Sequence, residues 1–135
     1  MFLSQSDILS EPVPMGLNEF FSHPKSDVGA PTEDLIFVRG TLEPGTGHNF
    51  HLHTDREEFL YILSGTIEQW VGTEKKICTA GDVIYVSHGK VHGSFNIGDD
   101  TAQILAIFNN KYAKAELSTD VSQQDPWVSL RSEGA

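Results

Sequence analysis

The chain has 135 residues, a length suited to one domain with its own hydrophobic core. Nineteen acidic residues against nine basic ones give a net charge of −10, which repels phosphate backbones and anionic lipids. The sequence therefore argues against nucleic acids and membrane surfaces as partners.

Two further features limit the class of protein. A single cysteine, Cys78, allows neither an internal disulfide nor a cysteine-based zinc site, and its apolar neighbours predict a packing role. The first residues have neither a basic start nor a long apolar run, so we expect no signal peptide and a cytoplasmic protein.

The N-terminal part is expected to contain little regular structure. Residues 1–16 have scattered apolar side chains interrupted by prolines and predict an extended arm, while residues 16–21 are compatible with a short strand or turn. Residues 23–32 contain two prolines and a glycine and predict a loop. Residues 1–33 are therefore expected to form an arm and loop ahead of the main domain.

From residue 34 to residue 110 the pattern is typical of an all-β fold. Short runs rich in β-branched and aromatic residues alternate with turn signals about every 8–12 residues, which predicts an antiparallel barrel or sandwich. Residues 111–135 are expected to form a tail that packs on the barrel or on a partner, with a short helix possible over 111–117. The expected strands are 35–42, 50–53, 58–63, 66–71, 76–79, 83–86, 91–96 and 102–108.

Three histidines and one glutamate have the character of a metal-ligand set. His51 and His53 are two apart in an expected strand, so both side chains leave the same face. Glu58 begins the next expected strand, and His92 lies in a later one. Three imidazoles and a carboxylate suit one divalent transition metal (Fe, Mn, Ni, Co or Zn) and leave coordination positions open for a substrate.

The spacing of these residues resembles a known motif. Gly45, His51, His53, Glu58 and Gly65 follow the pattern Gly-x5-His-x-His-x4-Glu-x6-Gly, which is the first motif of the cupin superfamily, at every position. The two glycines permit turns that a residue with a Cβ would resist.

A second stretch resembles the second cupin motif, Gly-x5-Pro-x-Gly-x2-His-x3-Asn. It matches at Gly81, Gly89, His92 and Asn96, while Ser87 stands where the motif has proline. That proline shapes a turn and is not a ligand, so the departure affects the expected loop and leaves the ligand set intact.

The resemblance covers about residues 34–108. The short spacing between the two motifs resembles that of small single-domain microbial cupins. It implies a double-stranded β-helix, or jelly-roll barrel, with an interior cavity. It also implies His51, His53, Glu58 and His92 as ligands of one metal ion per chain, and a homodimer, because small cupins commonly form one.

Two more histidines are candidates for proton transfer. His48 and His88 are expected in turns near the motifs, where either could exchange a proton with a bound substrate. An exposed loop histidine without a catalytic role is the alternative for each.

Four other residues are candidates for the substrate pocket. Arg39 interrupts an apolar strand and could anchor an anionic substrate or pair with a nearby acid. Tyr61, Gln69 and Trp70 lie on strands with one face turned inward, so some of them are expected to line the cavity. Packing is the alternative for each.

The first functional hypothesis is a metal-dependent dioxygenase acting on a small organic molecule. The same metal could instead support isomerase or lyase chemistry without oxygen. The third alternative is a non-catalytic protein that binds a small molecule. Basic residues are few in the barrel region, which disfavours phosphorylated substrates.

Overall fold

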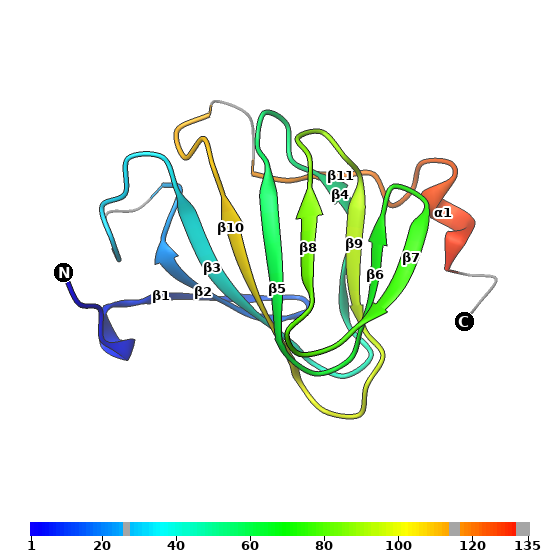
Figure 1. Ribbon diagram of the computed structural model, residues 1–135, viewed down its shortest axis with the longest axis horizontal. Helices are drawn as coiled ribbons and strands as arrows, with labels where there is room; N and C mark the ends of the chain where they lie inside the picture. Colours follow the sequence, from blue (N-terminus) through cyan, green and yellow to red (C-terminus); the bar gives the residue numbers. More distant parts are fainter. Residues whose placement is uncertain (26–27, 114–116, 132–135) are drawn as a thin grey trace.

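The computed structural model describes residues 1–25, 28–113 and 117–131, which form two antiparallel sheets facing each other (Figure 1). The larger sheet has the spatial order β1 (Leu9–Val13), β2 (Gly16–Ser22), β3 (Ile36–Leu42), β10 (Ala102–Phe108), β5 (Glu58–Ser64) and β8 (Val83–Val86). The smaller sheet has the order β11 (Thr119–Asp120), β4 (Gly47–Leu52), β9 (His92–Asn96), β6 (Ile67–Val71) and β7 (Glu74–Cys78). The predicted all-β double-sheet architecture is confirmed.

The strands expected from residue 34 onward are all present, with ends that shift by up to three residues. Gly65, which ends the first motif, has φ +90°, and a Cβ there would lie 2.5 Å from the Cβ of Ala102. The turn therefore requires glycine, as its place in the motif suggested. Between β8 and β9, the Lys90 amide donates to the Ser87 carbonyl at 3.1 Å, so this turn forms without the motif proline.

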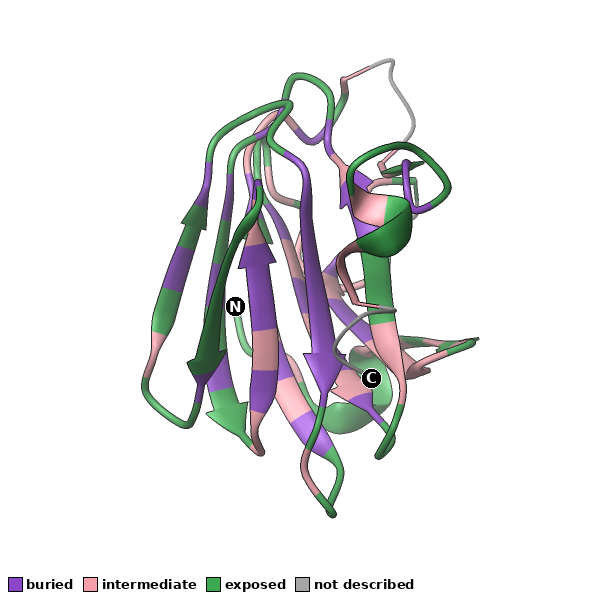
Figure 2. Ribbon diagram, turned by 90° about the vertical axis from the view of Figure 1, so that its right-hand side faces the viewer, coloured by how far each residue is buried: buried purple, intermediate pink, exposed green. Residues whose placement is uncertain are grey.

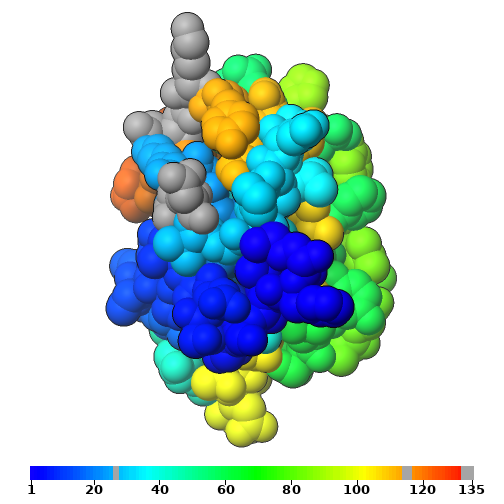
Figure 3. Space-filling view, turned by 90° about the vertical axis from the view of Figure 1, so that its left-hand side faces the viewer, coloured from blue at the N-terminus to red at the C-terminus, as the bar shows by residue number. Residues whose placement is uncertain are grey.

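The N-terminal segment differs from the expected arm. After a short 3-10 helix, η1 (Gln5–Asp7), β1 and β2 form a hairpin, and β2 pairs with β3 from Gly16↔Leu42 onward. Figure 3 shows these N-terminal residues, in blue, spread over one face of the molecule. A proline within the first strand is tolerated because β1 lies at the edge of the sheet, where a missing amide hydrogen costs no ladder bond.

Two apolar clusters stabilise the fold. The main core lies between the sheets and includes Cys78, whose thiol is buried, as its predicted packing role requires. The second cluster consists of Phe50, Trp70, Val91, Phe95 and Val121, with Leu52, Trp127 and Leu130 packed against it. Because side chains alternate along a strand, this second cluster uses the outer face of the smaller sheet.

The C-terminal part of the chain packs along this outer face. β11 extends the sheet beside β4, and α1 (Trp127–Leu130) follows (Figure 1). As a result β9 is buried at all five positions, on both faces (Figure 2). The helix expected at 111–117 includes residues 114–116, which lie outside the described residues. Within the described part of the chain, neither helix has the length and apolar character needed to cross a bilayer.

Candidate metal centre

An irregularity in β4 brings an additional histidine to the inner face. His48 pairs with Ser94 and His51 pairs with His92, so β4 has two residues between the pairs where β9 has one. This β-bulge shifts the alternation of side chains between the two faces of the strand by one residue. The side chain of Phe50 therefore joins the second apolar cluster on the outer face of the smaller sheet, called here the outer cluster. His48 and His51 would lie on opposite faces of a regular strand; here both lie on the inner one.

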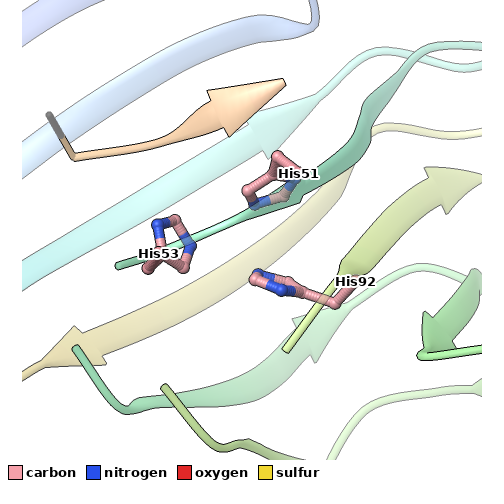
Figure 4. Close-up of side chains that lie close together, drawn as sticks. All are labelled: His51, His53 and His92. Carbon is pink, nitrogen blue, oxygen red and sulfur yellow. The ribbon is translucent and has the colours of Figure 1, made fainter. Parts of the chain in front are cut away.

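Three buried histidines converge inside the barrel. One ring nitrogen from each of His51, His53 and His92 lies within 4.8 Å of the other two. The side chains come from β4 and its extension and from the start of β9, and they point toward one another (Figure 4). The structure thus brings together the three imidazoles that the motifs placed in one ligand set.

Each of the three imidazoles has its Nδ1 beside a backbone carbonyl. A carbonyl can only accept, so each Nδ1 carries the hydrogen and each Nε2 has a free lone pair. Such bonds orient metal-binding histidines in many proteins. The Nδ1 donors bond from His51 to Asn49 (2.6 Å), from His53 to Leu117 (2.5 Å) and from His92 to Lys90 (3.0 Å).

Glu58 completes the cluster. Its Oε1 lies 2.8 Å from Nε2 of His92 and 3.4 Å from Nε2 of His53, and all three side chains are buried. Burial raises the pKa of Glu58, but hydrogen bonding and positive charge on the side of His53 and His92 outweigh it and hold the pKa at about 2. A metal ion held by the Nε2 lone pairs would act in the same direction, because it places positive charge beside the carboxylate. The carboxylate is therefore ionised at neutral pH.

These atoms fit a divalent metal ion. Among the described residues, Nε2 of His53, Nε2 of His92 and Oε1 of Glu58 are buried without a hydrogen-bonding partner of suitable geometry. Neighbouring ligand atoms around an octahedral ion with bonds of about 2.1 Å are about 3 Å apart, which matches the observed separations. Burial also lowers the pKa of His51 well below its usual range, which keeps this ring neutral, as ligation requires.

A cavity of about 230 Å³ lies next to this cluster, between the two sheets. His53 and Glu58 form part of its wall, and the other polar lining groups are few. Among the described residues, no lysine or arginine lines it. The apolar part of the lining consists of Met15, Phe20, Val38, Gly40, Leu42, Leu60, Ile104, Ala106, Phe108 and Leu117, and the polar part also includes Asn18, His48, Ser94 and Ser118.

The two proton-transfer candidates have different surroundings. His48 lines the cavity and its ring stacks on His51, whereas His88 lies in the exposed turn between β8 and β9, outside the cavity lining. Although part of its surface is exposed, desolvation by the surrounding protein lowers the pKa of His48 to about 4. Its ring is therefore neutral at pH 7 and has a free lone pair, although the lowered pKa makes it a weaker base than an ordinary histidine. His88 has the surroundings of an exposed loop histidine, which is the alternative that the sequence left open.

Arg39 and Tyr61 lie outside the cavity lining. Arg39 makes two hydrogen bonds of 3.0 Å to Glu19, the alternative to substrate binding that the sequence left open. Tyr61 is 43% exposed, on the outer face of the larger sheet. Both are placed by strand alternation, which turns every second side chain of β3 and β5 away from the cavity.

Gln69 and Trp70 face opposite sides of β6. Gln69 is buried, and its Oε1 accepts a 2.6 Å hydrogen bond from the hydroxyl of Ser94, which does line the cavity. Trp70 packs in the outer cluster against Phe50. Gln69 thus supports the cavity wall, and Trp70 has the packing role.

Several lining residues were not identified from the sequence. Met15 and Asn18 come from the N-terminal hairpin, and Leu117 and Ser118 come from the C-terminal part. None belongs to a motif, so the sequence carried no signal for them. Gly40 was visible as a glycine that interrupts an apolar strand, which is a signal for a close approach or a cavity.

Comparisons with curated proteins find plant relatives. Germin-like protein 1-1 of Oryza sativa subsp. japonica is 29% identical over 103 residues, which is 73% of this chain and 48% of the relative. Germin-like protein subfamily 3 member 2 of Arabidopsis thaliana is 28% identical over 93 residues, which is 65% of this chain and 41% of the relative. The chain spans about half the length of these relatives or less.

Solved structures with the same fold include bacterial proteins. KdgF from Halomonas sp. has a TM-score of 0.69 and 21% identity, with 82% of this chain and 94% of that chain covered. A predicted oxalate decarboxylase from Thermotoga maritima has a TM-score of 0.67 and 24% identity, with 82% and 99% covered. Oxalate decarboxylase of Lactobacillus farciminis, solved as a formate complex, has a TM-score of 0.73 and 20% identity, with 87% and 35% covered.

A family model provides the assignment. The model described as a cupin domain matches residues 38–108, just over half of the chain, and this range contains all four residues of the cluster. With the double-sheet barrel and the three buried histidines already described, the chain belongs to the cupin family.

Proposed function

We propose that this protein is a metal-dependent oxygenase that acts on a small, largely apolar organic molecule. The observation that carries the proposal is the position of the metal cluster. His53 and Glu58 form part of the wall of a cavity of about 230 Å³ whose other walls are mostly apolar. Such a cavity admits an uncharged organic molecule and dioxygen, and it keeps most water away from both.

The residues of the chain have distinct roles in this proposal. A bound divalent metal would polarise an enolate, phenolate or thiolate group of the substrate. His51, His53 and His92 hold the ion through Nε2, and the ionised carboxylate of Glu58 balances part of its charge. A neutral ring nitrogen of His48 accepts the proton that the substrate loses on binding.

The cavity also limits the substrate. Its volume lies below the range of about 300–1,000 Å³ typical of sites for drug-sized ligands, so a single ring or a short branched chain fits. Among the described residues no lysine or arginine lines it, so a second acidic group would have no counter-charge there. We therefore disfavour a doubly charged acid such as oxalate as the substrate, although two of the similar structures described above are named oxalate decarboxylases, one of them a predicted one.

A second candidate is isomerase or lyase chemistry at the same metal. His48 favours it specifically, because a neutral base beside a metal-bound substrate can move a proton without any oxidant. The two candidates share the metal site and differ only in their need for dioxygen.

Oxygen consumption separates these functions. Protein loaded with Fe(II) is mixed with β-diketones, catechols and thiols, and oxygen uptake is followed with an electrode. The proposal expects uptake with one of these classes that is lost in the apo-protein. Conversion of a substrate without oxygen would support the isomerase or lyase, and binding without conversion would support a binding protein; either result rejects the oxygenase.

We also propose that a second copy of the chain covers the outer face of the larger sheet. Six large apolar side chains are exposed there by 37–58%. β5, β8 and β10 contain no charged residue except Glu58, which points inward, although the chain carries a net charge of −10. The carboxylate of Glu57 reaches one end of this face, where it accepts a 2.6 Å hydrogen bond from the hydroxyl of Tyr85. The rest of the face is apolar and suits a copy of itself, because two such surfaces meet without bringing many like charges together. The six residues are Phe59, Tyr61, Leu63, Val83, Tyr85 and Ile107.

A further inference from the structure

The described C-terminal residues 117–131, called here the C-terminal segment, touch the metal cluster directly. The Leu117 carbonyl accepts the Nδ1 hydrogen of His53 at 2.5 Å, and the Ser118 hydroxyl lies 3.4 Å from the same nitrogen. Leu117 and Ser118 also line the cavity. A segment outside both motifs therefore takes part in the site.

The acceptor for His53 differs from the other two in its origin. His51 and His92 each bond to a carbonyl two residues earlier in sequence, so the adjacent chain supplies the acceptor. His53 bonds to a carbonyl 64 residues away. The orientation of His53 consequently depends on whether the C-terminal segment is in place.

The segment is attached to the strand that carries the ligands. Thr119 pairs with Leu52 and Asp120 pairs with His51. The Val121 amide donates to the Phe50 carbonyl at 3.0 Å, and the Val121 side chain is buried in the outer cluster. The chain from Leu117 to Val121 thus runs beside β4 at the height of its two ligand histidines.

Two anchors further along hold the segment on the smaller sheet. Trp127 packs against the outer cluster, and its Nε1 donates to the Gly72 carbonyl at 3.1 Å. The Arg131 guanidinium bonds to both carboxylate oxygens of Glu68, at 3.0 and 3.3 Å, and lies 3.8 Å from the ring centroid of Phe95. These contacts are on the outer face, away from the cavity.

We infer that the C-terminal segment positions His53 for metal binding. Docking of the segment on the smaller sheet and binding of the metal ion are therefore thermodynamically coupled. When the segment leaves β4, His53 loses its Nδ1 acceptor and the fixed direction of its Nε2 lone pair. Loss of such a supporting hydrogen bond typically lowers metal affinity about 10- to 100-fold. Linkage requires that metal binding strengthens docking by the same factor.

The inference deepens the proposed function, but it rests only on the metal site and not on a reaction. Its test therefore uses metal affinity and hydrogen exchange and no substrate. Failure of every oxygen-uptake assay would leave it standing, and an active oxygenase would not rescue it.

The first experiment measures the affinity of the full-length protein for Co²⁺ by competition with a chromophoric chelator. The variant Trp127→Ala combined with Arg131→Ala removes both anchors without touching the cavity. We expect its Kd to rise about 10- to 100-fold, with an altered Co²⁺ visible spectrum. Val128→Ala is the matched control, because Val128 is on the same helix and 42% exposed. An unchanged Kd in a folded double variant whose Val121 amide exchanges freely would overturn the inference.

The second experiment uses the unaltered protein, so it does not depend on a variant that folds. Hydrogen exchange at the Val121 amide is compared with and without Zn²⁺. We expect exchange to slow by the factor by which the double variant loses affinity for Zn²⁺, measured in the same competition assay, while amides of the edge hairpin formed by β1 and β2 keep their rates. Equal rates at Val121 with and without Zn²⁺ would contradict the coupling.

Discussion

The ring of His48 stacks on the ring of His51, with centroids 3.6 Å apart and planes inclined by 14°. His51 belongs to the metal cluster, and His48 lines the cavity. The stacked pair therefore connects the proposed metal to the space in which a substrate would bind. It depends on the bulge in β4, because residues three apart on a regular strand face opposite sides.

His92→Ala should abolish stoichiometric metal binding, with a loss of affinity of roughly 100-fold or more, because a ligand matters more than a supporting hydrogen bond. Metal content after purification and titration with Co²⁺ measure this. His23→Ala is the control, since His23 pairs with Glu11 in the N-terminal hairpin. Full metal occupancy in His92→Ala would refute the site.

His48→Phe should retain the metal and lower kcat about 10²- to 10⁴-fold, because phenylalanine preserves the stacking on His51 but cannot accept a proton. The measurement is the turnover of whichever substrate the oxygen-uptake screen identifies, together with metal content. His88→Ala, in an exposed turn, should behave like the unaltered protein. Equal turnover in His48→Phe and the unaltered protein would remove His48 from the reaction.

Gly40→Val should shrink the cavity at little cost to the fold. A Cβ at Gly40 meets its nearest atoms, in Asn18 and Met15, at 3.5 Å, which is ordinary contact, and a β-branched residue suits a strand. We expect a change in unfolding free energy within about 1.5 kcal/mol and loss of a xenon site in crystals under pressure. Gly65→Ala is the contrasting variant and should be strongly destabilising. Xenon density of equal occupancy in Gly40→Val would show that Gly40 does not set the cavity.

The Glu19–Arg39 pair should make stability depend on pH in acid. The hydrogen bond from Arg39 is the main cause that holds the pKa of Glu19 below its ordinary value. A depressed folded pKa stabilises the protein above the unfolded value of about 4.3, and this contribution is lost as pH falls through the folded pKa.

Glu19→Gln should therefore cost about 1 kcal/mol at pH 7 and progressively less below about pH 4, as urea unfolding across this range can measure. Glu68→Gln, which breaks the separate pair with Arg131, is the comparison on the other sheet. A cost for Glu19→Gln that stays constant down to pH 2 would mean that the ion pair is not its source.

Tyr61→Asp should convert the proposed homodimer to a monomer, because it places a charge among the apolar side chains on the outer face of the larger sheet. Light scattering coupled to size-exclusion chromatography gives the mass, expected near twice 14.9 kDa for the unaltered chain. Ile97→Asp is matched in exposure, at 46% against 43%, and should remain dimeric. A monomeric unaltered protein would end the proposal.

The sequence alone predicted the fold class and the four residues that the structure brings together, because strand patterns and the spacing within each motif are local signals. Alternating polarity and turn residues fix where strands begin and end, and the spacing from Gly45 to Gly65 needs only a strand, a turn and a second strand. The turn at Gly65 requires a φ that residues with a side chain rarely adopt, so the glycine in the sequence marks the position of this turn.

Only the tertiary structure decided which further residues reach the site, because register and long-range contacts have no local signature. The bulge that places His48 beside His51 depends on how β4 pairs with β9. The carbonyl that orients His53 comes from Leu117, 64 residues away. Trp70 faces outward and is nevertheless buried, because the C-terminal segment packs on that face of the sheet. Contacts of this kind form when strands distant in sequence are brought into register, and no window of sequence contains that information.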